Sequence, residues 1–98
     1  MDKIKIKQDM KKVDFKSFPI RLNIGSDEVK RVDTRESIGN AVYHNAAGVR
    51  GLDLAMKIYK SEGVIELDDG EWSLLMQIAN QTLVAPVVET LINIGKEE

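Results

Sequence analysis

The segment 62-EGVIELDDGEW-72 decides how this chain folds, because its pattern changes twice within a few residues. Gly63 can end a preceding helix, and the apolar run 64–67 after it reads as a short strand. Asp68 and Glu71 then have the spacing of a capping box, in which each side chain receives the backbone N–H of the other residue. We therefore expect a helix, a strand and a helix in succession, with the strand joining a β-region built elsewhere in the chain.

Downstream of this segment, two apolar helices are expected. The first covers about residues 69–80 and has apolar side chains at i, i+3, i+4 and i+7. In the final segment, 83–95, Pro86 suits the first turn of a second helix. Together these helices carry more apolar surface than a small domain needs to bury, so we expect an interface with another chain there. The residues expected at that interface are Trp72, Leu75, Met76, Ala79, Val87, Val88, Leu91 and Ile92.

Upstream, two more helices are expected on either side of 43-YHNAAGVRG-51. Asp33 and Glu36 repeat the capping-box spacing, and Gly48 is the expected end of the first helix. Neither GxxxxGK[ST] nor GxGxxG is present, so the segment is interpreted as a helix connection and not as a phosphate loop. The second helix is expected over about 49–61. Its buried side should consist of Leu52, Ala55, Ile58 and Tyr59.

The first 32 residues alternate charged and apolar side chains, which predicts a small β-region of two or three short strands. The expected strands are 3–7, 13–18 and 20–24, with a short return strand near 29–32 after turn residues at 25–27. Two sets of side chains should each share a face, namely Val13, Phe15 and Phe18 in one set and Ile20, Leu22 and Ile24 in the other.

The complete pattern predicts a single α+β domain over residues 1–98. A basic, β-rich region at 1–32 is followed by a mainly helical region at 33–98. The helical region holds about four helices, with one short strand between the second and the third.

The charge is uneven along the chain. Residues 1–21 contain seven Lys and Arg against three Asp, whereas residues 22–98 contain seven basic against thirteen acidic residues. A basic N-terminal region can contact nucleic acid or an acidic surface. The alternative is a solvated edge whose lysines oppose aggregation, and we favour it because there is no arginine cluster.

The composition argues against several kinds of chemistry. Cysteine is absent, which excludes disulfides, thiolate metal sites and a cysteine nucleophile. His44 is the only histidine, and no partner for catalysis lies near it in the sequence. The acidic group around Asp68 does not have EF-hand spacing and is interpreted as a helix start. We therefore expect a non-enzymatic protein without a metal or cofactor. We also expect it to be cytoplasmic, because no signal-like or membrane-spanning segment is apparent.

The segments 33-DTRESIGNAVY-43 and 52-LDLAMKIYKSEGVIELDDGEW-72, with the final apolar helix, resemble small uncharacterised accessory proteins of phages, prophages and other mobile elements. This resemblance implies a bacterial or phage context but no catalytic motif. The apolar excess of residues 72–94, beside the lack of a reactive constellation, favours an interaction module that forms homo-oligomers or docks on another protein. The alternative hypothesis is a nucleic-acid-binding regulator that uses the basic N-terminal region.

Overall fold

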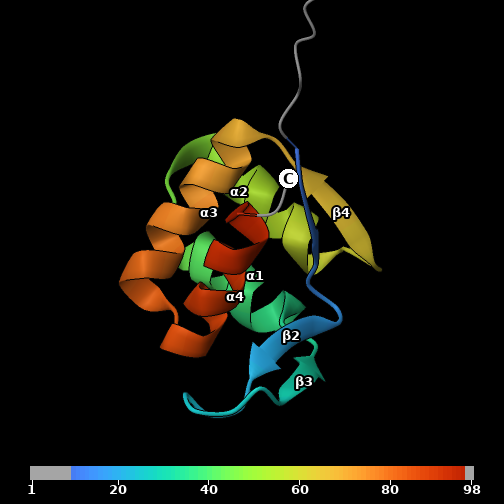
Figure 1. Ribbon diagram of the computed structural model, residues 1–98. Helices are drawn as coiled ribbons and strands as arrows, with labels where there is room; N and C mark the ends of the chain where they lie inside the picture. Colours follow the sequence, from blue (N-terminus) through green and yellow to red (C-terminus); the bar gives the residue numbers. More distant parts are fainter. Residues whose placement is uncertain (1–9, 97–98) are drawn as a thin grey trace, which may run out of the picture.

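The chain folds as an α+β protein, and a computed structural model describes residues 10–96 (Figure 1). Within this range, three short strands and two helices are followed by a fourth strand and two further helices. This order confirms the fold class predicted from the sequence. The elements are β1 (Lys11–Asp14), β2 (Phe18–Arg21), β3 (Val29–Val32), α1 (Arg35–Asn45), α2 (Gly48–Tyr59), β4 (Val64–Leu67), α3 (Asp69–Thr82) and α4 (Ala85–Lys96).

The strands form two separate antiparallel pairs. In one pair, residues 11–14 of β1 run against residues 67–64 of β4. In the other pair, residues 18–21 of β2 run against residues 32–29 of β3. The strand predicted before α3 therefore joins the N-terminal β-region, and it does so through β1.

The strand predicted over 13–18 is wrong, because the chain turns after Asp14. Asp14 Oδ1 accepts the backbone N–H groups of Lys16 and Ser17, each at 3.0 Å. A short carboxylate that binds backbone groups two and three residues later is typical turn chemistry. The shared face is nevertheless confirmed, since the structure buries Val13, Phe15 and Phe18.

The strand predicted over 20–24 is wrong beyond Arg21, where β2 ends. Leu22 and Ile24 are 49% and 93% exposed, so they do not share a buried face with Ile20. The chain leaves the strand because it must turn toward β3. Pairing of β2 with β3 leaves residues 22–28 for that connection.

The loop between β2 and β3 contains the predicted turn residues 25–27. Its base is closed by the Leu22 N–H, which donates to the Glu28 carbonyl at 3.1 Å. β3 coincides with the predicted return strand at 29–32. The strand predicted at 3–7 lies outside the described residues.

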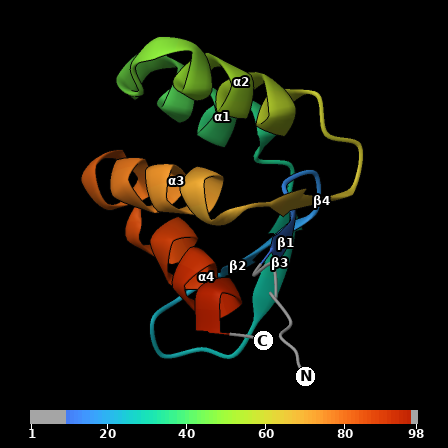
Figure 2. The same ribbon diagram turned by 90° about the horizontal axis from the view of Figure 1, so that it is seen from above.

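The four helices are arranged in three layers beside the strands (Figure 2). α1 and α2 lie side by side in one outer layer, α3 lies in the middle, and α4 lies on the other side of α3. Every layer contributes side chains to one apolar core. Its fully buried members include Ile38 and Val42 of α1, Leu54 and Ile58 of α2, Leu75 of α3, and Leu91 of α4.

The start of α1 differs from the prediction. Its N-cap is Thr34, with no side-chain capping bond, so the predicted capping box of Asp33 and Glu36 is wrong. The backbone N–H and the hydroxyl of Thr34 both donate to the carbonyl of Phe15, at 2.7 and 2.9 Å. The Asp33 carboxylate accepts the N–H of Arg35 at 3.1 Å instead. Anchoring to the turn after β1 therefore decides where α1 begins.

Two glycines shape the connection between α1 and α2. Gly48 does not end α1, as predicted, but is the first residue of α2, and its φ of 74° is readily adopted only by glycine. Gly51 lies against Ala46, where an added Cβ would be 2.5 Å from the Ala46 Cβ. The segment 43–51 is therefore a tight helix connection, as predicted, and both glycines are required by its geometry.

The start of α3 follows the sequence pattern closely. The Glu71 N–H donates to Asp68 Oδ1 at 2.8 Å, and the Asp68 N–H donates to Glu71 Oε1 at 2.9 Å, which confirms the predicted capping box. Pro86 lies in the first turn of α4, also as predicted. The last turn of α4 packs on α3, because an added Cβ at Gly95 would be 3.2 Å from Cζ2 of Trp72.

Candidate interaction surfaces

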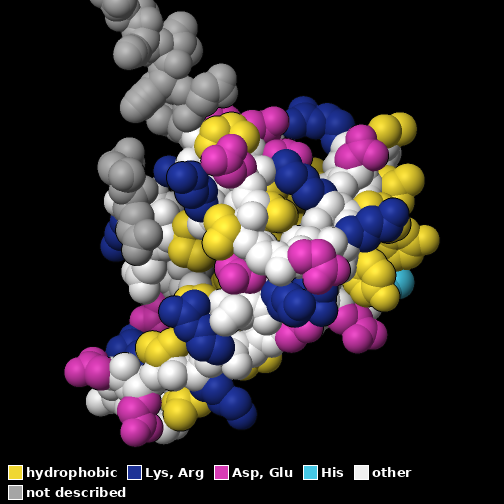
Figure 3. Space-filling model, turned by 90° about the vertical axis from the view of Figure 1, so that its right-hand side faces the viewer, with side chains coloured by type: hydrophobic (Ala, Val, Ile, Leu, Met, Phe, Trp, Pro, Cys, Tyr) yellow, Lys and Arg dark blue, Asp and Glu magenta, His cyan; other side chains and the backbone are white. Residues whose placement is uncertain are grey.

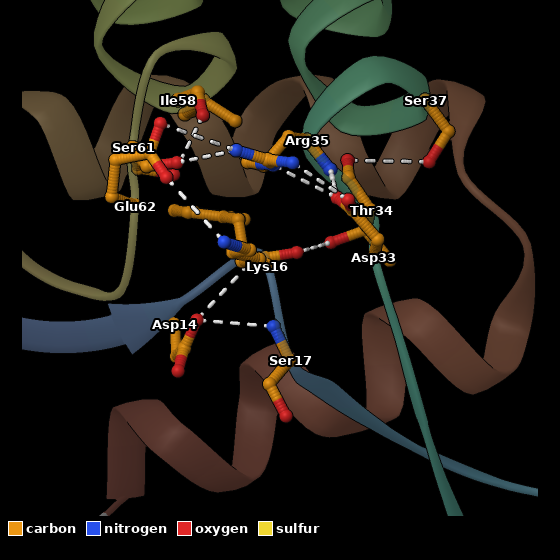
Figure 4. Close-up of polar contacts among 11 residues, drawn as sticks. Asp14, Lys16, Ser17, Asp33, Thr34, Arg35, Ser37, Ile58, Ser61 and Glu62 are labelled. Carbon is orange, nitrogen blue, oxygen red and sulfur yellow. Dashed lines mark hydrogen bonds and ion pairs between the residues drawn. The ribbon is translucent and has the colours of Figure 1, made fainter.

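A polar cluster at the base of the α1–α2 pair is centred on Arg35 (Figure 4). Arg35 Nη1 donates to the carbonyl of Ser61 at 2.9 Å, while Nε and Nη2 donate to the two Asp33 oxygens at 3.0 and 2.8 Å. Glu62 Oε2 lies 3.8 Å from Arg35 Nη1, and Glu62 Oε1 lies 3.4 Å from Lys16 Nζ. The cluster joins the start of α1, the end of α2 and the turn after β1.

The electrostatics of this cluster fit a structural role. The Arg35 side chain, and then its backbone N–H, donate hydrogen bonds that lower the pKa of Asp33 to about 2. The same side-chain hydrogen bond raises the pKa of Arg35. A carboxylate that stays ionised and is bound by a guanidinium is a weak general base near neutral pH. The ion pair of Asp33 and Arg35 therefore holds neighbouring elements together.

His44 lies on the exposed side of α1, near its end. Its ring is edge-on to the ring of Tyr43, with centroids 5.4 Å apart. Among residues 10–96, the structure gives His44 no ion pair with a carboxylate. The site that would have suggested catalysis, a histidine bonded to an acid in a deep pocket, is not formed by the described residues.

The eight expected interface residues fall into three groups according to their burial. Half of them face the chain's own core and are not available at its surface, namely Leu75, Ala79, Val87 and Leu91. Trp72, Met76 and Val88 are partly buried against that core. Ile92 is 41% exposed. The core of this small domain therefore absorbs much of the apolar surface that the sequence assigned to a partner.

One exposed apolar surface remains beside α4. An open groove of ≈ 720 Å³ separates the start and outer face of α4 from the loop after β2. We call it the α4 groove and define it by five of its apolar lining residues, namely Leu22, Ile24, Leu83, Val88 and Ile92. Only Val88 and Ile92 among these residues belong to the expected interface.

A second exposed apolar surface runs along the outer side of α2. We call it the α2 stripe and define it as Val49, Leu52, Met56 and Tyr59, which are 72%, 48%, 38% and 56% exposed. The prediction that Leu52 and Tyr59 lie on the buried side is wrong. The buried face of α2 is formed by Gly51, Leu54, Ala55 and Ile58.

Sequence reasoning missed the α2 stripe because α2 is apolar on two sides. Either side satisfies helical periodicity, so the spacing alone could not identify which one faces the core. The signal for the outer side was the 3-4-3 spacing of its four residues, which is the spacing of a helix–helix seam.

The α2 stripe continues onto α1. Gly39 allows the two helices to approach closely, since an added Cβ there would lie 3.5 Å from the Ala55 carbonyl and from the Tyr59 Cβ. Beside this contact, Tyr43 of α1 is 57% exposed and shares a shallow pocket with Met56 and Tyr59. Figure 3 shows hydrophobic side chains gathered along its right-hand edge, where the α1–α2 layer lies.

The described basic residues near the N-terminus are largely engaged within the chain. Lys11 Nζ donates to the Gly95 carbonyl at 3.2 Å, and Lys16 pairs with Glu62. Arg21 forms an ion pair with Glu89. Among the described residues of this region, Lys16 and Arg21 are therefore paired with carboxylates, and nucleic-acid binding stays a prediction.

Comparisons with known proteins found no matching family model, no matching curated protein and no matching solved structure. Two further observations concern residues 10–96 only. This part of the chain holds no group of three or more His, Cys, Asp or Glu side chains placed to bind a metal ion. It also contains no helix with the length and apolar character needed to cross a membrane.

Proposed function

We propose that this chain is a non-catalytic protein–protein interaction module that acts by forming homo-oligomers. The observation that supports this function best is the apolar surface exposed along the α2 stripe. Isolated exposed apolar residues are ordinary, but a contiguous row on one helix is typical of an interaction site. The phage or mobile-element context stays a prediction beside this proposal.

The polar chemistry of the described residues favours the same function. Their most extensive polar cluster, around Arg35, is committed to joining α1, α2 and the β1–β2 turn. His44 is surface-exposed and lies beside Tyr43. An interaction module needs neither an activated nucleophile nor a general base, so these polar contacts are compatible with that function.

The test is the molar mass in solution as a function of protein concentration. We expect light scattering coupled to size exclusion to show a dimer or a larger homo-oligomer that dissociates on dilution across roughly three decades of concentration. A mass that stays at 11.0 kDa up to high micromolar concentration would contradict the proposed function.

The nucleic-acid alternative is tested separately, by electrophoretic mobility shift at low salt. A basic surface that neutralises phosphates binds more weakly as salt increases, and the slope reports the number of contacts. Binding of DNA or RNA with a steep salt dependence would favour this alternative over the interaction module.

A further inference from the structure

The α2 stripe has the spacing that helix pairing requires. Val49, Leu52, Met56 and Tyr59 follow one another at intervals of three, four and three residues, which are the a and d positions of a heptad. This stripe is distinct from the buried face of α2, so α2 can pack on α1 and α3 and still present a seam outward. A narrow a/d seam fits the groove of another helix better than it fits a flat surface.

We propose that a second copy of this chain covers the α2 stripe, with its own α2 packed antiparallel across a two-fold axis. This inference rests on the proposed function and specifies its surface and geometry. A two-fold contact is isologous, meaning that each residue of the surface meets its counterpart in both directions. The α2 stripes of the two copies then cover each other, and the assembly closes as a dimer without an unpaired α2 stripe.

The residue sizes along the stripe favour the antiparallel arrangement. When the two helices run in opposite directions, Val49 faces Tyr59 of the second copy, and Leu52 faces Met56 of the second copy. The smallest side chain of the stripe therefore meets the largest, and two side chains of similar volume meet in the inner layers. A parallel pair would instead place tyrosine against tyrosine and valine against valine, which gives layers of unequal thickness.

The exposed area matches what a dimer of this kind needs. With Tyr43 included, the exposed fractions of these side chains leave roughly 400 Å² of apolar surface per copy. A standard interface buries about 800 Å² per partner, of which about 57% is apolar. The exposed side chains Glu36 and Asn40 of α1 and Asp53 and Lys60 of α2 border the stripe and supply the polar rim of such an interface.

The first experiment compares glutamate substitutions on two exposed apolar surfaces. Leu52→Glu places a charge in the seam, and Ile24→Glu makes the same change at a site that is 93% exposed in the β2–β3 loop. We expect Leu52→Glu to raise the dimer dissociation constant at least about thirtyfold, as for an interface hot spot. Ile24→Glu should leave the dissociation constant unchanged. Circular dichroism verifies that both variants keep their helices.

The second experiment fixes the direction of the helices by disulfide cross-linking and does not depend on a charged variant folding. The chain has no cysteine, so Leu52→Cys and Met56→Cys each introduce a single thiol. When equal amounts of the two variants are mixed and oxidised, random pairing would give twice as much mixed disulfide as either homodisulfide, and the antiparallel geometry predicts the mixed 52–56 disulfide well above that ratio. Preferential 52–52 and 56–56 disulfides would overturn the antiparallel arrangement.

The outcomes separate this inference from the proposed function. A dimer that persists in Leu52→Glu but dissociates in Ile92→Glu would place the contact in the α4 groove, so the function would stand and the α2 geometry would be wrong. A dimer that survives both substitutions and forms no 52–56 disulfide would also exclude the α2 stripe. A wild-type chain that stays monomeric would contradict the function itself.

Discussion

Arg35 shows how one side chain can fix the relative positions of several elements. It reaches the Ser61 carbonyl after α2 and the Asp33 carboxylate before α1, while the neighbouring Thr34 donates twice to the Phe15 carbonyl. The sequence identified Asp33 as a residue that binds a backbone N–H, and that part is correct. It could not show that Arg35 would take both carboxylate oxygens, because that contact depends on a helix start fixed by Phe15.

The lowered pKa of Asp33 predicts a specific response to acid. Its folded-state pKa of about 2 is below the ordinary value of 3.8 for an aspartate, so the ionised form stabilises the folded state above about pH 4. That contribution is lost as the pH falls from about 4 toward 2. We expect the difference in unfolding free energy between wild type and Asp33→Asn to shrink over this range in urea titrations.

The control for this prediction is Asp27→Asn, in the exposed loop between β2 and β3. Within residues 10–96, the structure gives Asp27 no ion pair. The two asparagine variants should therefore differ in their acid profiles. Identical profiles between pH 4 and 2 would show that Arg35 does not hold Asp33 in its ionised form.

Gly51 provides a second test at the residue scale. Gly51→Ala forces a methyl group to within 2.5 Å of the Ala46 Cβ, so the α1–α2 connection must shift. We expect a loss of about 1–3 kcal/mol in unfolding free energy, measured by chemical denaturation. Gly63→Ala is the matched control, since an added Cβ there meets nothing within 4 Å. Equal stability of the two variants would contradict the close approach.

At the scale of elements, the two Asp-x-x-Glu patterns show what a local signal can and cannot predict. The pattern at Asp68 forms a complete capping box, because β4 ends directly before α3 and the Asp68 carboxylate accepts the Glu71 N–H. The same pattern at Asp33 fails, because Arg35 occupies the carboxylate and α1 begins one residue later than predicted. Capping chemistry is local, whereas the position of a helix start also depends on tertiary contacts.

This difference predicts unequal costs for the same substitution. Asp68→Ala removes the side-chain acceptor for the Glu71 N–H, so we expect a loss of about 0.5–2 kcal/mol in unfolding free energy, measured by thermal or urea denaturation. Asp68→Asn keeps an acceptor and should recover most of that loss. If the alanine and asparagine variants were equally unstable, the hydrogen bond would not be the cause.

α2 marks the limit of prediction from periodicity. Five elements, namely β3, α2, β4, α3 and α4, are close to their predicted bounds, and the capping box and Pro86 explain the starts of α3 and α4. The predicted buried side of α2 is right for Ala55 and Ile58 but wrong for Leu52 and Tyr59, because both sides of the helix are apolar. The 3-4-3 spacing marks the stripe as a side suited to helix pairing, but only the positions of α1 and α3 determine which side is covered within the chain.

At the scale of the whole molecule, strand pairing is the feature that the sequence could not specify. β1 pairs with β4, about fifty residues away, while β2 pairs with β3 through a short loop. The alternation in each strand predicts a buried face but not a neighbour. The expectation that the strand before α3 joins the N-terminal β-region is confirmed. The structure identifies β1 as its partner, which the sequence pattern did not specify.

The division of the expected interface between core and surface leads to a prediction on two adjacent residues. Leu91 is fully buried and Ile92 is 41% exposed on the same turn of α4. We expect Leu91→Ala to reduce the unfolding free energy by about 2–5 kcal/mol, and Ile92→Ala to reduce it by less than about 1 kcal/mol, in urea titrations. Similar losses for both variants would mean that Ile92 is covered in solution.

The contact between α3 and the last turn of α4 gives the molecule a built-in optical reporter. Trp72 is the only tryptophan in the chain, and its indole ring packs against Gly95. Emission from an indole shifts to longer wavelength when water reaches the ring. Release of the C-terminal helix would therefore be visible as a red shift without any added dye. A separate early shift during denaturation would identify α4 as the first part of the molecule to detach.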